Sequence, residues 1–322
     1  MRLLLPAFLA LGGIGCAGQV AADTGGDAMA WLKKIAAASR QINYAGTFVY
    51  QHGRQVETSR IAHWADASGE YEKLETLDGP PREIMRNNDN VACYLPDSKT
   101  VVIEKRSTRQ FPVLLPEQLS GISDNYVAKK GDQGRVAGFD CQVIVLEPTD
   151  NLRYGHKFCA ELVTGLPLLA RTFNERNELV DSFAFTQITI GSGVSKNMLK
   201  SRYAAISQTW RTDKTALERN ETLADTGWVL KNQPAGFRKL TEMKRSIAGR
   251  AMQIEHIVYT DGLAAVSVFI EPMPKSPPLA GPTYQGAVNI YVKSQANRMV
   301  TVVGEAPART VKQIAESLGP RE

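Results

Sequence analysis

The residue types that could carry catalysis occur in this chain, but not at the spacings that catalysis or metal binding requires. The sequence contains no Gly-x-Ser-x-Gly elbow, no Ser-x-x-Lys pair, no His-Glu-x-x-His and no Cys-x-x-Cys. The four histidines are dispersed, each in or beside a strand-like run: His52, His63, His156 and His256. Gly191-Ser192-Gly193 lacks the third glycine of a phosphate-binding loop, so we interpret it as a hinge. The sequence therefore predicts no enzyme and no metal or cofactor site.

Length and composition indicate a globular protein of two domains. A chain of 322 residues is too long for one typical core. Hydrophobic residues make up 43% of it and charged residues 22%, as in ordinary folded proteins. The net charge of +5 is mild, and the densest basic stretch, residues 239–250, also contains Glu242. We therefore expect no nucleic acid among the partners.

The first 22 residues have the features of an export signal. Arg2 precedes the apolar run Leu3–Ile14, and Val20-Ala21-Ala22 precedes the expected cleavage before Asp23. This run is shorter than the roughly 20 residues that span a bilayer, so we expect a soluble exported protein. An alternative stays open at Cys16, because Gly13-Ile14-Gly15-Cys16 resembles a lipoprotein cleavage site.

Removal of the signal leaves Cys93, Cys141 and Cys159, and export permits a disulfide. Cys141 and Cys159 are equally far from Asp150, within a predicted hairpin turn. In a regular hairpin they would lie opposite each other, near the separation that a disulfide requires. The alternative is two buried free cysteines. Cys93 is then a core residue or an odd thiol.

The segment 23–190 has the pattern of one β-rich domain. Asp27–Arg40 has the apolar spacing of a helix, and a period of two begins near Asn43. A short helix over Pro112–Ile122 should cover part of the sheet. These elements predict one long, strongly curved antiparallel sheet with one or two covering helices. Further strands are expected at Val56–Trp64, Tyr71–Leu77, Glu83–Arg86, Val91–Leu95, Val101–Glu104, Phe139–Glu147, Tyr154–Leu162, Leu168–Asn174 and Leu179–Ile190.

A polar segment, 191–224, should link this domain to a small α+β domain over 225–322. Met252–Thr260 and Leu263–Ile270 flank Asp261-Gly262, which predicts a hairpin with a type I′ turn. A proline-rich loop over 271–282 should prevent regular pairing. A second hairpin, Ala287–Lys293 with Met299–Val303, precedes a helix that begins near Pro307.

The first domain has more apolar strand surface than two short helices easily cover. A partly closed sheet of this kind leaves a groove, which suits an acyl chain or an apolar peptide. The alternative is that these side chains simply form the core. The candidates for such a lipid groove are Phe48, Tyr50, Tyr94, Val143, Val145, Phe183 and Phe185.

Several strings, taken in order, resemble the RseB/MucB family of periplasmic sigma-E regulators. The resemblance covers the chain after the signal, with one departure. The family often has a longer aromatic motif before the Gly-Phe pair, whereas here Trp228 is set apart from Gln233-Pro234. The strings are Asp78-Gly79-Pro80 with Arg82-Glu83, Pro234-x-Gly236-Phe237, Tyr259-x-Asp261-Gly262-Leu263, and Thr301-Val302-Val303-Gly304-Glu305-x-Pro307 with Ile314-Ala315-Glu316.

The resemblance implies a fold and a function. The large domain would be an unclosed β-barrel similar to the lipoprotein carriers LolA and LolB. The protein would bind the periplasmic segment of a transmembrane anti-sigma factor, shield it from site-1 proteolysis, and release it on binding lipid, lipopolysaccharide or mislocalised lipoprotein. Partner contacts are expected near Tyr259, Asp261, Gly262 and Arg298, although Asp261-Gly262 alone could be only a tight turn. A periplasmic lipid or lipoprotein carrier is the alternative function, and a homo-oligomer stays open.

Overall fold

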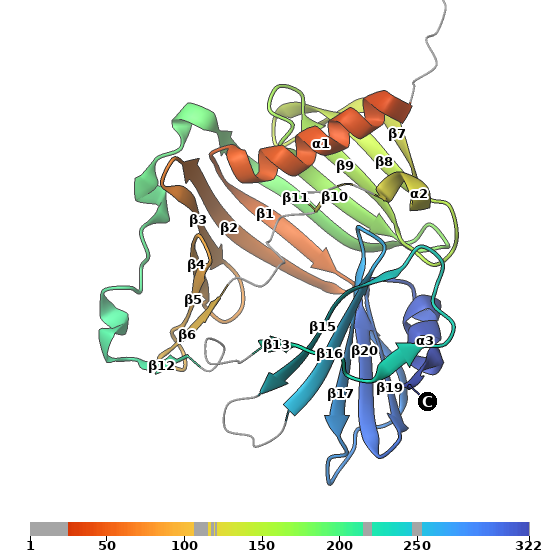
Figure 1. Ribbon diagram of the computed structural model, residues 1–322. Helices are drawn as coiled ribbons and strands as arrows, with labels where there is room; N and C mark the ends of the chain where they lie inside the picture. The colour runs from red at the N-terminus through yellow and green to blue at the C-terminus, as the bar shows by residue number, and fades with distance from the viewer. Residues whose placement is uncertain are drawn as a thin grey trace, which may run out of the picture.

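Two large β-sheets, each with a helix on one face, and a separate pair of short strands make up the described structure (Figure 1). This computed structural model describes residues 25–105, 115–116, 119, 121–214, 221–246 and 253–321. The predicted signal peptide over 1–22, Cys16 and most of the helix predicted over Pro112–Ile122 lie outside these residues. Within the described residues, no helix is both long enough and apolar enough to cross a bilayer.

The larger sheet has twelve strands in the order β12-β6-β5-β4-β3-β2-β1-β11-β10-β9-β8-β7. Its two end strands, β12 and β7, do not pair, so the sheet is curved but not closed. The prediction of an unclosed, mainly antiparallel barrel with covering helices is therefore confirmed. The strands are β1 (Tyr44–His52), β2 (Gln55–Asp66), β3 (Gly69–Thr76), β4 (Glu83–Asn87), β5 (Asn90–Leu95), β6 (Thr100–Lys105), β7 (Tyr126–Val136), β8 (Phe139–Pro148), β9 (Gly155–Glu161), β10 (Pro167–Phe173), β11 (Leu179–Ile190) and β12 (Arg211–Asp213).

Helix α1 (Gly25–Gln41) lies across the inner, concave face of this sheet (Figure 1). Leu32, Ile35 and Ala36 share one face of the helix and are buried. They join the strand residues Phe48 and Phe158 in one apolar core. A four-residue helix, α2 (Ile122–Asn125), precedes β7 and buries Ile122 in the same core.

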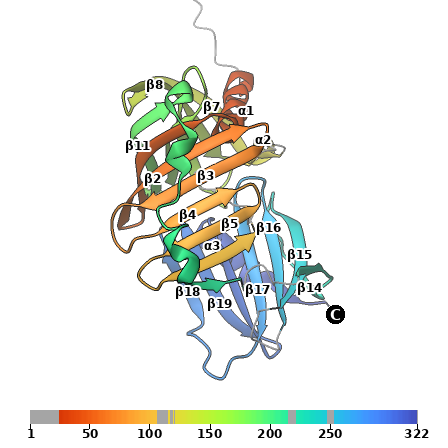
Figure 2. The same ribbon diagram turned by 90° about the vertical axis from the view of Figure 1, so that its left-hand side faces the viewer.

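Strands β3–β6 extend the sheet beyond α1, and we call them the wing. The segment 191–213, which we call the strap, crosses the outer face of the wing (Figure 2). It contains three short 3-10 turns, η1 (Gly191–Gly193), η2 (Lys196–Leu199) and η3 (Ile206–Thr209), and ends in β12, which pairs in parallel with β6. The segment predicted as a linker thus adds an edge strand to the larger sheet.

A buried carboxylate fixes the strap to the wing. The Glu83 side chain is fully buried and accepts hydrogen bonds from Ser201 Oγ and, at 3.1 Å, from the Arg202 amide. Lys73 Nζ lies 3.2 Å from the same carboxylate and donates to the Lys200 carbonyl at 2.8 Å. The strap is therefore tied to the sheet by charged groups that cannot readily be left without partners.

The smaller sheet has seven strands in the order β13-β15-β16-β17-β20-β19-β18, with α3 (Ala308–Ser317) on one face. Val311, Ile314 and Ala315 of α3 pack with Ile257 and Val302 of the sheet. This confirms the predicted helix and the sheet beneath it. The strands are β13 (Glu221–Leu223), β15 (Arg238–Ser246), β16 (Gln253–Thr260), β17 (Ala265–Pro272), β18 (Gly281–Gln285), β19 (Val288–Gln295) and β20 (Arg298–Gly304), with a separate pair formed by β14 (Trp228–Leu230) and β21 (Leu318–Pro320).

The hairpin predicted around Asp261-Gly262 is present, but the prediction of a two-residue type I′ turn is wrong. Thr260 pairs with Ala265, so four residues form the loop instead of two. The Asp261 side chain accepts from the amides of Leu263 and Ala264, which stabilises the longer loop. The turn with positive φ at both central residues instead joins β19 to β20, at Ala296 and Asn297.

The proline-rich loop prediction is partly wrong. Strand β18 begins at Gly281, includes Pro282 and pairs with β19. It lies at the edge of its sheet, where a residue without an N–H is tolerated.

Cys141 and Cys159 form a disulfide, with Cα atoms 5.3 Å apart. They are not directly opposite, because Cys141 pairs with Glu161 and Cys159 with Val143. The hairpin is centred on Asn151 rather than on Asp150, which moves the expected register by two residues. Cys93 is a free, half-buried thiol on β5, and burial raises its pKa.

Replacing Cys141 and Cys159 together by alanine should lower the free energy of unfolding by about 3 kcal/mol, because the bond closes a loop with a sequence separation of 18. Urea denaturation followed by circular dichroism measures this change. Cys93→Ala is the control and should change the midpoint by less than a third as much. Equal losses for the two variants would contradict a stabilising role for the bond.

Candidate functional site

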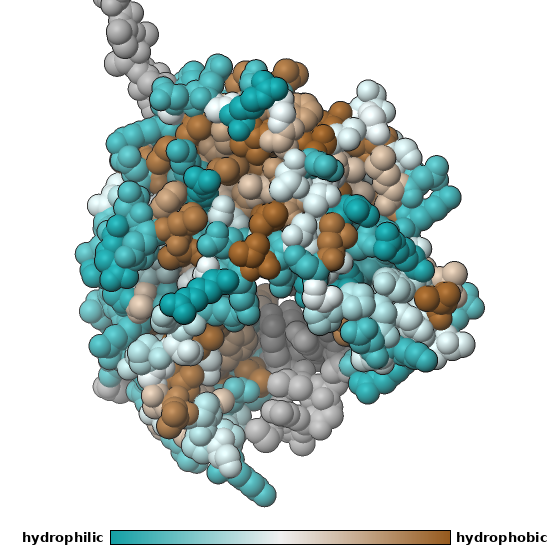
Figure 3. All heavy atoms as spheres, turned by 180° about the vertical axis from the view of Figure 1, so that it is seen from behind, coloured by the Kyte–Doolittle hydropathy of each residue, from teal (hydrophilic) through white to brown (hydrophobic). Residues whose placement is uncertain are grey.

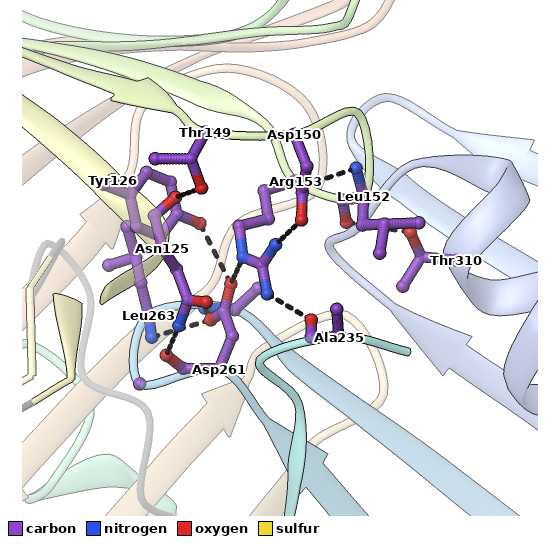
Figure 4. A network of polar contacts seen from close by, with 12 residues as sticks. Asn125, Tyr126, Thr149, Asp150, Leu152, Arg153, Ala235, Asp261, Leu263 and Thr310 are labelled. Atoms are coloured by element: carbon purple, nitrogen blue, oxygen red, sulfur yellow. Dashed lines mark hydrogen bonds and ion pairs between the residues drawn. The ribbon is translucent and has the colours of Figure 1, made fainter. Parts of the chain in front are cut away.

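A buried ion pair joins the half of the molecule that contains the larger sheet to the half that contains the smaller sheet (Figure 4). Arg153, in the β8–β9 loop, places Nε 2.9 Å from Asp261 Oδ2 in the loop after β16, and neither side chain is exposed. Arg153 Nη2 also donates to the Ala235 carbonyl at 2.6 Å, and Nη1 donates to Asp150. The guanidinium lies 5.3 Å from the centre of the Phe237 ring. The charge is thus enclosed by groups from both halves.

Two consecutive residues, the last of α2 and the first of β7, complete the surroundings of Asp261. Tyr126 Oη donates to Asp261 Oδ2 at 3.1 Å, and Asn125 Nδ2 donates to the Asp261 carbonyl at 3.2 Å. Burial, and next the negative charge of Asp261, raise the pKa of Tyr126 well above its usual value. The phenol therefore stays protonated and remains a hydrogen-bond donor to the carboxylate.

Two further hydrogen bonds cross the junction close to the ion pair, and a third joins the halves elsewhere, from Gln285 Nε2 on β18 to Gln55 Oε1 on β2 at 3.0 Å. Thr310 Oγ1 in the first turn of α3 donates to the Leu152 carbonyl at 2.8 Å. Asn289 Nδ2 on β19 donates to Tyr154 Oη at 2.8 Å. A pocket of about 410 Å³ opens beside the ion pair, and it is lined by Gly121, Asp124, Asn125, Gly236, Arg238 and Asp261. Together these contacts set the angle between the sheets.

Two of the four residues predicted to contact a partner are buried in this structure. Tyr259 is buried in the core of the smaller sheet, where burial raises its pKa to about 12. Asp261 lies in the junction, and Gly262 follows it in the loop. Arg298 pairs with Pro272, at the end of β17 away from Tyr259, so the structure does not bring the four residues together. Their contact with a partner stays a prediction.

The residues predicted to line a lipid groove divide between three environments. Phe48, Phe183 and Phe185 form a buried aromatic cluster with ring centres 5.0 to 6.0 Å apart, so the core alternative describes these three. Tyr50 Oη donates to Asp181 at 3.3 Å and is half-buried. The structure thus places this part of the predicted groove in or beside the core to which α1 also contributes.

The other three groove candidates lie on the outer face of the sheet, although Val143 also packs against the buried core, which includes Cys159 opposite it. Val143 and Val145 alternate with Ile144 and Leu146, which point into the core. Tyr94 also lies on the outer face, where its ring centre is 6.4 Å from that of Tyr203 in the strap. The structure therefore does not gather the seven residues into one groove.

Two partly buried apolar surfaces were not predicted from the sequence. The first, which we call the inner wing face, is a cross-strand row of Leu74, Ile84, Cys93 and Val102. The second, which we call the open C-terminal face, lies on the smaller sheet opposite α3 and includes Val258, Phe269, Ile290 and Val303. Alternation along a strand predicts which of its residues share a face. The pairing between strands must also be known before residues of different strands can be assigned to one surface.

These two faces belong to opposite sides of a hollow. In Figure 1 the wing lies to the left of the smaller sheet and α3 to its right, so the open C-terminal face is turned toward the wing. Seen from behind, the described residues are hollowed between the two halves (Figure 3). Among the described residues, no group of three or more His, Cys, Asp or Glu could hold a metal ion. Two partly buried apolar faces on either side of a hollow form a surface suited to binding.

Two family models match the chain in sequence order. The MucB/RseB N-terminal domain matches residues 27–203, and the MucB/RseB C-terminal domain matches residues 222–319. The chain therefore belongs to the MucB/RseB family, as the strings in its sequence indicated.

Named relatives and a solved structure cover nearly the whole chain. The sigma factor AlgU regulatory protein MucB of Pseudomonas aeruginosa is 30% identical over 309 residues, which cover 94% of this chain and 93% of that protein. The sigma-E factor regulatory protein RseB of Escherichia coli is 24% identical over 295 residues, covering 90% and 89%. A complex of Pseudomonas aeruginosa MucA and MucB is similar with a TM-score of 0.71 and 27% identity, covering 92% of this chain and 99% of that one.

Gly236→Ala should weaken the junction, because the added Cβ would lie 2.1 Å from Asn125 Oδ1 and 2.2 Å from Arg153 Nη2. We expect a loss of about 2–4 kcal/mol in the free energy of unfolding, measured with urea. Gly227→Ala is the matched control, because its φ is also +76° and no atom lies within 4 Å. It should lose only the roughly 1–2 kcal/mol of backbone strain. Equal losses would mean that the junction tolerates the methyl group.

Proposed function

We propose that this chain is a periplasmic negative regulator of a sigma-E-type envelope stress response. It binds the periplasmic segment of a transmembrane anti-sigma factor and shields that segment from site-1 proteolysis. The observation that carries the proposal is the similarity to the MucA–MucB complex, which covers 92% of this chain and so includes both sheets. The names of the relatives support the same regulatory role.

The partner segment is proposed to lie in the hollow between the inner wing face and the open C-terminal face. Each face presents apolar side chains that are only partly buried. A segment that brings apolar side chains to both would remove them from water at once, which favours binding by about 25 cal/mol for each Å² buried. Neither face alone offers this, so the proposal needs both sheets.

Shielding follows from the same placement. A protease must take its substrate into its own active site, and a segment enclosed between two sheets is not available for that. Release requires a ligand that binds the partner-free form better than the partner-bound form. We propose lipid, lipopolysaccharide or the acyl chains of mislocalised lipoprotein as that ligand, because an acyl chain suits the inner wing face.

Val258→Asp should weaken partner binding at least tenfold, because it places a charge on the open C-terminal face. Its neighbours across the strands, Thr241 and Ser267, are polar, so the fold should accept the change. Calorimetry with the periplasmic segment of Pseudomonas aeruginosa MucA measures affinity. Leu279→Asp, in an exposed loop of the same half, is the control and should bind as the unmodified chain does.

A protection assay tests the regulatory part. The same segment, incubated with a site-1 protease, should be cleaved more slowly when the unmodified chain is present and at the free rate with Val258→Asp. Lipopolysaccharide added to the complex should restore cleavage. No binding of the segment by the unmodified chain, or equal cleavage with and without it, would rule out the proposed shielding.

A further inference from the structure

The two halves of the molecule have separate apolar cores. Among the described residues, the buried core of the larger sheet contains no residue beyond Phe185, and that of the smaller sheet begins at Trp228. Leu263, in the loop after β16, is the described residue of the smaller half that packs against the larger core. The contact between the halves is therefore mainly polar, which is typical of domains that move relative to each other.

Each charged group in the junction also has a partner in its own half. Arg153 has Asp150, three residues away in the same loop. Asp261 has the amides of Leu263 and Ala264, at 2.9 and 2.7 Å. If the halves separate, neither charge is left without a partner, and water can satisfy the remaining donors and acceptors.

The amide side chains at the junction follow the same arrangement. Asn289 Nδ2 donates to the Ala306 carbonyl of its own half as well as to Tyr154, both at 2.8 Å. Asn125 Nδ2 donates to the Gly121 carbonyl of its own half at 3.3 Å, as well as to Asp261. In a junction that never opened, these second hydrogen-bond partners within the same half would not be needed to satisfy the side chains. Breaking a buried ion pair costs less free energy when each charged group keeps another partner in its own half.

We infer that the junction is a latch that opens and closes in the folded protein, and that Arg153 is the positioning residue that holds it closed. Arg153 reaches Asp261, the Ala235 carbonyl and the Phe237 ring at once, so its guanidinium joins two separate segments of the smaller half. Opening separates the inner wing face from the open C-terminal face. The latch thus extends the proposed function, because it regulates access to the proposed partner site.

Hydrogen exchange tests the latch without any partner, using the full mature chain. The unmodified protein should exchange the amides of 234–238 (those of 235–238, since Pro234 has no N–H) and of 261–264 at least ~100-fold faster than the core strands β16 and β17, through local opening. Arg153→Met keeps the length of the side chain but removes its charge. It should speed exchange in 234–238 and 261–264 by ~10-fold, although both segments lie in the other half, and leave β16 and β17 unchanged.

Arg321→Met is the matched control. Arg321 forms an ion pair with Asp225 at 2.7 Å, and both side chains are exposed within the smaller half. This variant should leave the exchange of 261–264 unchanged. Asp261→Asn provides a second test read in the opposite direction, since it should speed exchange at 149–154 in the larger half while β8 and β9 stay protected.

Two results would overturn the latch. The first is exchange of the junction amides only as slowly as the cores, which would mean that the halves are fixed together. The second is an unchanged rate at 234–238 and 261–264 in Arg153→Met with intact cores, which would mean that Arg153 does not hold the closed form. The exchange experiment contains no partner, so its result does not depend on whether the MucA segment binds. Failure of that segment to bind would contradict the proposed function but would not change the test of the latch.

Discussion

The closed arrangement of this molecule depends on keeping the charge of Arg153 out of water. Burying a guanidinium is unfavourable unless acceptors surround it, and here they come from three separate loops. Other local features follow from that requirement. Gly236 carries no side chain where the guanidinium passes, Tyr126 remains a protonated donor, and Asp261 sits in a four-residue loop that frees one carboxylate oxygen for the ion pair.

The strap meets a different constraint, which is that the wing is a single layer of strands. A sheet covered on neither face would expose its apolar side chains on both sides. The strap covers the outer face through Glu83, Lys73 and the contact between Tyr94 and Tyr203. The inner wing face can therefore stay uncovered by α1 while the strands remain ordered, and among the described residues its apolar side chains are only partly buried.

The sequence alone was sufficient for the elements and insufficient for the surfaces. Alternation along β8 correctly groups Val143 with Val145, but it does not say which face of the sheet receives α1. The same limit applies to Tyr94, which lies on the outer face and contacts Tyr203 of the strap. The polar composition of the strap had led to its prediction as a linker. The register of the Cys141–Cys159 hairpin depends on the shape of its loop, and a shift of one residue in the turn centre moves every pair by two. The local sequence pattern predicts which residues of one strand share a face. Which face is covered, and how neighbouring strands are aligned, depends on contacts with segments distant in the sequence.

The strings that revealed the family lie mainly along the junction and at the strap. Pro234-x-Gly236-Phe237 supplies the carbonyl, the space and the ring around Arg153, and Asp261 supplies the counter-charge. Glu83 belongs to another of the strings and ties the strap. These positions require one residue type each, because a charge, a positive φ or a close approach admits few alternatives. The inner wing face and the open C-terminal face require only apolar side chains of about the right size, which many residues satisfy. Apart from the string Thr301–Pro307, which includes Val303 of the open C-terminal face, the recognisable strings therefore mark the geometry that sets the angle between the two faces in the closed form, and not the faces themselves.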